Sequence, residues 1–152
     1  MKLSEKFEAF LPKAAVLDSQ EDRSAYASDW TKTQGDCSLV LLPRTKEEVA
    51  LILKEASLNK ISVVPSGGRT GLAGGAVSSK ESIVLNLSKM NQIGEVDLLG
   101  RTIRVQAGAT TQSVHEACEP FGLTWPIDLA AKGSSQIGGN LDTNAGGVRV
   151  IR

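Results

Sequence analysis

The alternation of apolar and polar positions divides the chain into short elements, and the clearest is a helix over residues 45–59. Its apolar side chains recur at helical spacing, and Thr45 and Glu48 match a capping box at its start. Strand-like runs of apolar and β-branched residues flank this helix at 38–42 and 61–64. The order strand, helix, strand predicts one β-α-β unit with a right-handed crossover.

Three further strands are indicated in the second half of the chain. Residues 82–87 form a short apolar run that is typical of a buried strand. Residues 93–96 and 102–106 alternate between apolar and polar positions, and Leu99 and Gly100 stand between them. This arrangement predicts two strands joined by a hairpin turn.

A second helix is predicted after these strands. Thr110 or Thr111 suits its N-cap, and Gly122 suits its end. Apolar residues recur at helical intervals, at Val114, Ala117, Cys118 and Phe121. The pattern therefore places Cys118 in the core, whereas His115 falls beside the apolar stripe and is expected at the surface.

The N-terminal part of the chain is also expected to be helical. Residues 3–11 and 19–26 have helical patterns and carry no recognisable chemistry. We therefore divide the chain into an N-terminal helical segment, residues 1–36, and one domain over residues 37–152.

Composition limits the classes of partner. The chain has 152 residues, of which 41% are hydrophobic, which is enough for one compact unit with a core. Its 17 basic residues balance 17 acidic ones, so no charge excess of the kind that marks nucleic-acid or anionic-membrane binding is present. Glu5 and Glu8 interrupt the opening apolar positions, which does not suit a signal peptide or a membrane span. A cytoplasmic protein with a small-molecule or protein partner is expected.

The cysteines and the single histidine predict neither a disulfide framework nor a metal site. Cys37 and Cys118 stand far apart without a CxxC spacing, and His115 has no second histidine to work with. Two free, buried thiols are the expectation.

Glycine is concentrated in two places. Ten of the fifteen glycines lie within residues 67–75 and 133–147. The first of these loops follows a predicted strand, and consecutive glycines there let backbone N–H groups turn toward an anion. Arg69 adds a positive charge, while Ser66 and Thr70 add hydroxyl donors, all suited to a pyrophosphate. The alternative is an ordinary surface loop.

Two well-known nucleotide motifs are missing from the first loop. It contains neither GxxxxGK[ST] nor a GxGxxG that opens a helix, which argues against a P-loop nucleoside triphosphatase and against a Rossmann-type dehydrogenase. In the second segment, residues 137–144 predict a short helix with Ser134 and Ser135 as caps and its first amides aimed at a ligand. The alternative for this segment is a structural loop packed tightly against a neighbour.

Together the two stretches, PSGGRTGLAGGA with DLAAKGSSQIGGN and TNAGG, resemble the PCMH-type FAD-binding domain, also called the vanillyl-alcohol oxidase type. The resemblance runs from about Leu39 to Arg152 and is strongest to the branch of glycolate oxidase subunits, D-lactate dehydrogenases and D-2-hydroxyglutarate dehydrogenases. It implies an α+β fold in which a β-α-β unit begins a small mixed sheet flanked by helices.

The resemblance also implies the residues that bind FAD. In the first loop these are Ser66, Gly67, Gly68, Arg69, Thr70, Gly71 and Leu72. In the second they are Pro126, Asp128, Ser134, Ser135, Gly138, Gly139, Asn140, Thr143 and Asn144. Arg69 stands where relatives with covalent FAD have a histidine, so non-covalent FAD is expected. Asp142 is expected to point away from the diphosphate, which it would repel.

By the same resemblance, the intact enzyme oxidises a 2-hydroxy acid of the glycolate, D-lactate or D-2-hydroxyglutarate type by hydride transfer to flavin N5. The chain is then the N-terminal part of that enzyme, ending as a strand begins at residues 148–152. No catalytic residue is nominated, and the chain alone is expected to be inactive. The alternatives are another flavoenzyme of the same fold, such as a peptidoglycan-precursor reductase, or a non-catalytic fragment that self-associates through open sheet edges.

Overall fold

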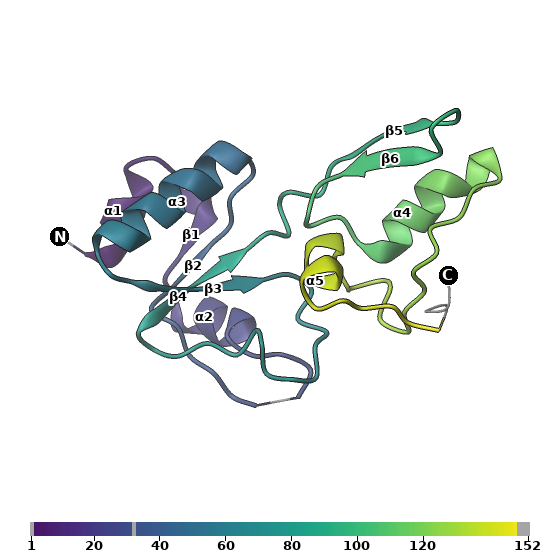
Figure 1. The fold of residues 1–152 in the computed structure, drawn as a ribbon. Helices are drawn as coiled ribbons and strands as arrows, with labels where there is room; N and C mark the ends of the chain where they lie inside the picture. The colour runs from purple at the N-terminus through teal and green to yellow at the C-terminus, as the bar shows by residue number, and fades with distance from the viewer. Residues whose placement is uncertain (1, 32, 149–152) are drawn as a thin grey trace.

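A computed structural model describes residues 2–31 and 33–148 of the chain, and it arranges them in two groups of elements (Figure 1). The first group comprises α1 (Leu3–Glu8), a 3-10 turn η1 (Lys13–Ala15), β1 (Val16–Leu17), α2 (Gln20–Tyr26), β2 (Leu39–Leu41), α3 (Lys46–Leu58), β3 (Ser62–Ser66) and β4 (Ser82–Asn86). The second comprises β5 (Ile93–Asp97), β6 (Thr102–Val105), α4 (Thr111–Cys118) and the 3-10 turn η2 (Glu119–Phe121). A short helix, α5 (Ile137–Asp142), lies between the two groups.

The first group is built on a four-stranded mixed sheet with the order β1-β2-β4-β3. β2, β4 and β3 run parallel, and β1 pairs antiparallel with β2. The predicted unit of strand, helix and strand is present, but β4 is inserted between its two strands. α1 and α3 lie together on one side of the sheet and α2 lies on the other (Figure 1). The structure confirms the expected α+β class with a small mixed sheet flanked by helices.

The start of α3 forms one half of the predicted capping box, and the glutamate bonds one residue before the N-cap. The Thr45 side chain accepts a hydrogen bond from the backbone N–H of Glu48 at 3.2 Å, and the Glu48 carboxylate accepts one from the N–H of Arg44 at 2.6 Å. Ile52 is fully buried against the sheet, but Leu53 is 45% exposed. The apolar stripe that faces the core is therefore narrower than the sequence pattern suggests.

The N-terminal segment packs into the same core as the sheet. Phe7 of α1 is fully buried, and Leu11 and Val16 join it in one apolar cluster with β2 and β4. α1 ends at Glu8, three residues before the predicted end. α2 begins after Ser19, whose side chain accepts from the N–H of Asp22.

The second group contains the predicted hairpin and the second helix. Asp97 Oδ1 accepts hydrogen bonds from the N–H groups of Leu99 and Gly100, at 3.0 and 2.9 Å, which closes the turn between β5 and β6. The left-handed residue of this turn is Arg101, with φ of 48°.

α4 begins after Thr110, which acts as its N-cap. It ends sooner than predicted, because Pro120 draws the chain into the turn η2 before Gly122 takes a φ of 66°. Phe121 is consequently 50% exposed, and the expectation that it continues the buried stripe is wrong. Cys118 is buried as predicted, and with Ala109, Val114 and Ile137 it forms a second, smaller core.

The strand predicted over residues 148–152 lies almost wholly outside the described residues. Within the described ranges, no helix is long and apolar enough to cross a membrane.

Candidate functional site

The two glycine-rich segments meet around one cavity of about 500 Å³. The first loop enters directly from the end of β3, and the second reaches the cavity through α5 and the residues before it. A smaller cavity of about 250 Å³ adjoins it, since Ser66, Gly67, Gln136, Gly139 and Asp142 line both. The two loops that the sequence predicts to face one ligand line the same cavity.

Backbone contact between the loops explains one glycine. A Cβ built on Gly68 would lie 1.9 Å from the carbonyl oxygen of Ser134, far inside van der Waals contact. The first loop can therefore approach the second only where position 68 has no side chain. The role of Gly68 is to bring the loops together, rather than only to expose amides to a ligand.

Other glycines face open space. A Cβ at Gly71, Gly75 or Gly139 would meet no atom within 4 Å, and all three positions line the larger cavity. All three glycines are exposed, so a Cβ at any of them would meet open space. The cavity lining is thus free of side chains at these positions, which fits a bulky cofactor such as FAD.

Gln136 provides a polar group at the same place. It is 9% exposed, lines both cavities, and its Oε1 has no hydrogen-bond partner among the described residues. A buried acceptor without a donor is costly unless a ligand or water supplies one. This unsatisfied oxygen is a second observation that fits a ligand with hydroxyl or N–H groups. Gln136 is not predicted from the sequence, since a glutamine between small residues gives no signal of its own.

Asn86 anchors the base of the first loop and was also missed from the sequence. It is fully buried at the end of β4, and its Nδ2 donates to Ser66 Oγ at 3.2 Å and to the Gly67 carbonyl at 3.0 Å. Its Oδ1 accepts from the N–H of Ser88 at 3.1 Å. These bonds fix the direction in which the loop leaves the sheet.

Arg69 has a partner outside the loop. Its backbone is left-handed, with φ of 54°, and its guanidinium lies 4.7 Å from the centre of the Tyr26 ring. This is the geometry of a cation–π contact. The Arg69 guanidinium, which the sequence predicts to bind a pyrophosphate, therefore contacts the last residue of α2 in this structure.

A second link joins the N-terminal segment to the loop. Asp29 Oδ2 accepts a hydrogen bond from the N–H of Gly74 at 3.0 Å, while Oδ1 accepts from the N–H and hydroxyl of Thr31. The hydrogen bonds from Thr31 hold the pKa of the Asp29 carboxyl below its ordinary value of 3.8, against the opposing effect of burial. The carboxylate is thus charged at neutral pH and satisfied by donors of the chain itself.

Most of the residues predicted to bind the cofactor lie together at this site. Those that line the larger cavity are Ser66, Gly67, Gly68, Arg69, Thr70, Gly71, Leu72, Gly139, Asn140 and Thr143. Gly138 lines the smaller cavity. Asn140 is further fixed by its Nδ2, which donates to the buried Thr111 Oγ1 at 2.6 Å.

The remaining predicted residues line neither cavity. The Ser134 carbonyl lies against Gly68. Ser135 is buried, and its hydroxyl lies 2.9 Å from Thr111 Oγ1. Asp128 forms an ion pair with Lys132 at 3.1 Å. Pro126 lines a different hollow near Trp125, and Asn144 follows α5 in a left-handed conformation with φ of 51°.

Two expectations about the second loop are wrong. Gln136, and not Ser134 or Ser135, is the N-cap residue of α5, and the amides of Ile137 and Gly138 already donate to the carbonyls of Ala109 and Ala107. These amides are therefore not aimed at a ligand. Asp142 lines both cavities, and the expectation that its side chain points away from the diphosphate stays a prediction.

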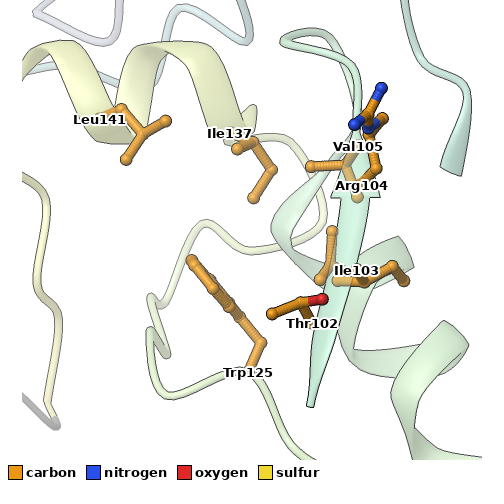
Figure 2. Close-up of a pocket in the computed structure, with 8 residues that line it drawn as sticks. Thr102, Ile103, Arg104, Val105, Trp125, Ile137 and Leu141 are labelled. Atoms are coloured by element: carbon orange, nitrogen blue, oxygen red, sulfur yellow. The ribbon is translucent and has the colours of Figure 1, made fainter. Parts of the chain in front are cut away.

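An apolar hollow of about 480 Å³ lies on the far side of α5. Figure 2 shows the Trp125 ring beside Thr102 of β6, with Ile137 and Leu141 extending from α5. The Trp125 Nε1 is buried without a hydrogen-bond partner among the described residues. None of these residues is among those that the sequence predicted for the site.

Comparison with known proteins gives one family. Residues 37–152 match the family described as FAD binding domain. A D-2-hydroxyglutarate dehydrogenase of Xanthomonas citri pv. viticola is 43% identical over 93% of this chain, and a mitochondrial D-2-hydroxyglutarate dehydrogenase of Danio rerio is 40% identical over 96%. The chain spans only 30% and 27% of the lengths of these two relatives.

A solved structure shares the fold. That of an alkyldihydroxyacetonephosphate synthase superposes on 94% of the chain with a TM-score of 0.86, at 19% sequence identity, and the match covers 30% of that protein. At this level of identity the likeness concerns the fold alone.

Proposed function

This chain belongs to the FAD binding domain family, and we propose that its two glycine-rich loops hold FAD in the cavity between them. The observation that carries the proposal is the cavity lining that is free of side chains. Gly71, Gly75 and Gly139 line one cavity of about 500 Å³, and a Cβ at any of them would meet no other atom within 4 Å. A cofactor with a flat ring and a diphosphate needs such side-chain-free walls.

The residues proposed to hold FAD divide by their chemistry. The first loop, from Ser66 to Leu72, offers backbone N–H groups and two hydroxyls to the pyrophosphate, and the Arg69 guanidinium on the Tyr26 ring adds a positive charge beside the loop. Gln136 Oε1 is suited to accept a hydrogen bond from a hydroxyl or N–H group of the cofactor. Gly138, Gly139, Asn140 and Thr143 line the opposite wall. When bound, the flavin would supply the redox chemistry as a hydride acceptor.

For the whole protein we propose oxidation of a 2-hydroxy acid, with D-2-hydroxyglutarate as the first substrate to test. The support is the similarity to two proteins named D-2-hydroxyglutarate dehydrogenase. The chain alone is proposed to be inactive, because it spans under a third of either relative.

We propose that the cofactor is bound without a covalent link. The first loop has Arg69 after the paired glycines, and the only histidine, His115, lies on α4 with its Nε2 2.9 Å from the Ile127 carbonyl. Acid precipitation of the flavin-loaded protein should therefore leave all of the flavin in the supernatant. Flavin retained in the pellet would contradict this proposal.

The FAD site can be tested by substituting Gly139 with leucine. A Cβ at position 139 meets no atom within 4 Å, so a leucine should add bulk at the cavity, and replacing a helical glycine should leave stability unchanged or raise it by up to about 1 kcal/mol. We expect FAD affinity, followed by flavin fluorescence, to fall at least about tenfold, which corresponds to about 1.4 kcal/mol. Ala50→Leu on the exposed side of α3 adds the same kind of bulk outside the site and should leave FAD affinity unchanged.

The titration is carried out on the 152-residue chain and on a version extended through the sequence that follows it in the gene. Binding by the extended version alone keeps the family site and makes this chain an incomplete part of it. A colourless protein in both versions, whether monomer or oligomer, would contradict FAD binding. Equal affinity in the wild type and Gly139→Leu would move the cofactor away from this cavity.

We also propose the division into an N-terminal helical segment, residues 1–36, and an FAD-binding domain over residues 37–152. The family match begins at Cys37, although β1 and α1 pack into the same core as β2. The cytoplasmic location stays a proposal, because the Danio rerio relative is named mitochondrial. Fractionation of cells that express the complete gene would test it.

A further inference from the structure

Residues that precede the family match hold the glycine-rich loop at several points. The backbone N–H of Ser78 donates to the Ala27 carbonyl at 3.1 Å, and Arg69 stacks on Tyr26. Asp29 accepts from the N–H of Gly74 at 3.0 Å. The family match covers residues 37–152, so Tyr26, Ala27 and Asp29 lie outside it.

Asp29 is the unusual member of this set. Its side chain is a carboxylate, only 9% exposed, beside a loop that would bind the negatively charged pyrophosphate. A negative charge at that place opposes anion binding unless its field is taken up by local donors. Three donors do this, namely the N–H and hydroxyl of Thr31 on Oδ1 and the N–H of Gly74 on Oδ2. The negative charge of Asp29 therefore stabilises the backbone conformation at Thr31 and Gly74.

Gly74 is the point in the loop where such a bond has most effect. It has a φ of 78°, a left-handed conformation that glycine adopts without strain. Its flanking residues Ala73 and Gly75 both line the cavity. Fixing the Gly74 amide thus fixes the stretch of backbone that forms one wall of the cavity.

We propose that Asp29 is a positioning residue for the cofactor: its carboxylate clamps Gly74 and holds the glycine-rich loop in the shape that binds FAD. This inference rests on the proposed function. The clamp does not need to touch the cofactor. It orders the loop in advance, so the loop loses less conformational freedom when FAD binds, and the affinity is higher. FAD affinity then depends on a residue that precedes the family match.

The test is Asp29→Asn, which removes one half of the clamp. Thr31 presents two donors to Oδ1, so an asparagine keeps its oxygen toward Thr31 and turns its NH₂ group toward the Gly74 N–H. Donor then faces donor, and the loop is released. We expect amide exchange in peptides covering residues 70–78 to accelerate without FAD, and FAD affinity to fall about tenfold, in line with loss of a hydrogen bond to a charged group.

Asp97→Asn is the matched control. Asp97 also closes a turn by accepting from two backbone N–H groups, but it does so in the β5–β6 hairpin, away from the cavity. The control should leave FAD affinity and exchange in residues 70–78 unchanged. If Asp29→Asn does not fold, Thr31→Val replaces it, since it removes the hydroxyl that orients the carboxylate and keeps the charge.

The outcomes separate the two claims. If the wild type binds FAD and the Asp29 or Thr31 variant binds it equally well, the clamp has no role in binding and this inference is overturned. If Asp29→Asn weakens binding while exchange in residues 70–78 stays at the wild-type rate, Asp29 does not act through the loop and the inference is again overturned. If the wild type itself does not bind in either length, the proposed function fails first.

Discussion

At the scale of single residues, the glycines of the two loops do different physical work. Gly68 is a contact glycine, because its Cα faces the Ser134 carbonyl and leaves no room for a Cβ. Gly71 is a cavity glycine, since a Cβ there would enter open space. The sequence predicts that both belong to a ligand site but does not distinguish these roles, which depend on a partner 66 residues away.

Alanine at these two positions should separate the roles. Gly68→Ala puts a methyl group into the Ser134 carbonyl, and overpacking against backbone should cost about 2 kcal/mol or more of unfolding free energy. Gly71→Ala meets nothing and should change stability by less than about 0.5 kcal/mol. Urea unfolding of both variants measures the difference, and similar stabilities would show that the loops are not in contact at Gly68.

At the scale of elements, local signals predicted what local forces decide. The helix α3 begins where its capping box places it, and β4 and the β5–β6 hairpin lie where alternation indicates. The errors arise where a residue that is distant in the sequence forms the hydrogen bonds that a local cap was expected to form. Ser135 appeared to be a helix cap, but Thr111 of α4 binds its hydroxyl and its carbonyl, so Gln136 becomes the N-cap.

For the candidate site, the sequence likewise predicted the local feature, the two glycine-rich loops, but not the residues that support them. The glycine-rich loops and their meeting were readable from composition and motif, because glycine is selected there for the backbone it allows. Asn86, Gln136 and Asp29 were not readable. Each acts through a bond or a position that depends on tertiary packing, such as Asn86 with the Gly67 carbonyl across 19 residues.

The element that holds the first sheet together is β4. It is the strand with neighbours on both sides in the parallel part, and Ile83 pairs in register with Leu39 of β2 and Val63 of β3. Ile83→Ala should lower the free energy of unfolding by about 2–5 kcal/mol, because the cavity it leaves in a fully buried strand cannot collapse easily. Leu58→Ala, at the exposed end of α3, should change it by less than about 0.5 kcal/mol in the same urea titration. A small effect at Ile83 would mean that β4 is not the centre of the core.

At the scale of the whole molecule, the described residues form two apolar cores of unequal size. The larger one joins the N-terminal segment, α3 and the four-stranded sheet, while the smaller one has Ala109, Val114, Cys118 and Ile137 as its buried members. Burial of apolar area is the main source of stability, so the smaller core should resist unfolding less. The FAD site proposed here lies between them, where β3 of the first group meets α5 (Figure 1).

The two cysteines provide a built-in probe of this division, because Cys37 belongs to the larger core and Cys118 to the smaller. Both thiols are buried, and burial together with the nearby Asp36 charge raises the pKa of Cys37. Neither should react with a maleimide in the native protein at pH 7, since the thiolate is the reactive form. Under pulse labelling in increasing urea, Cys118 should become reactive before Cys37, with single-cysteine variants Cys37→Ala and Cys118→Ala to assign each signal. Simultaneous exposure would show one cooperative unit, in which the two cores and the cofactor cavity between them unfold together.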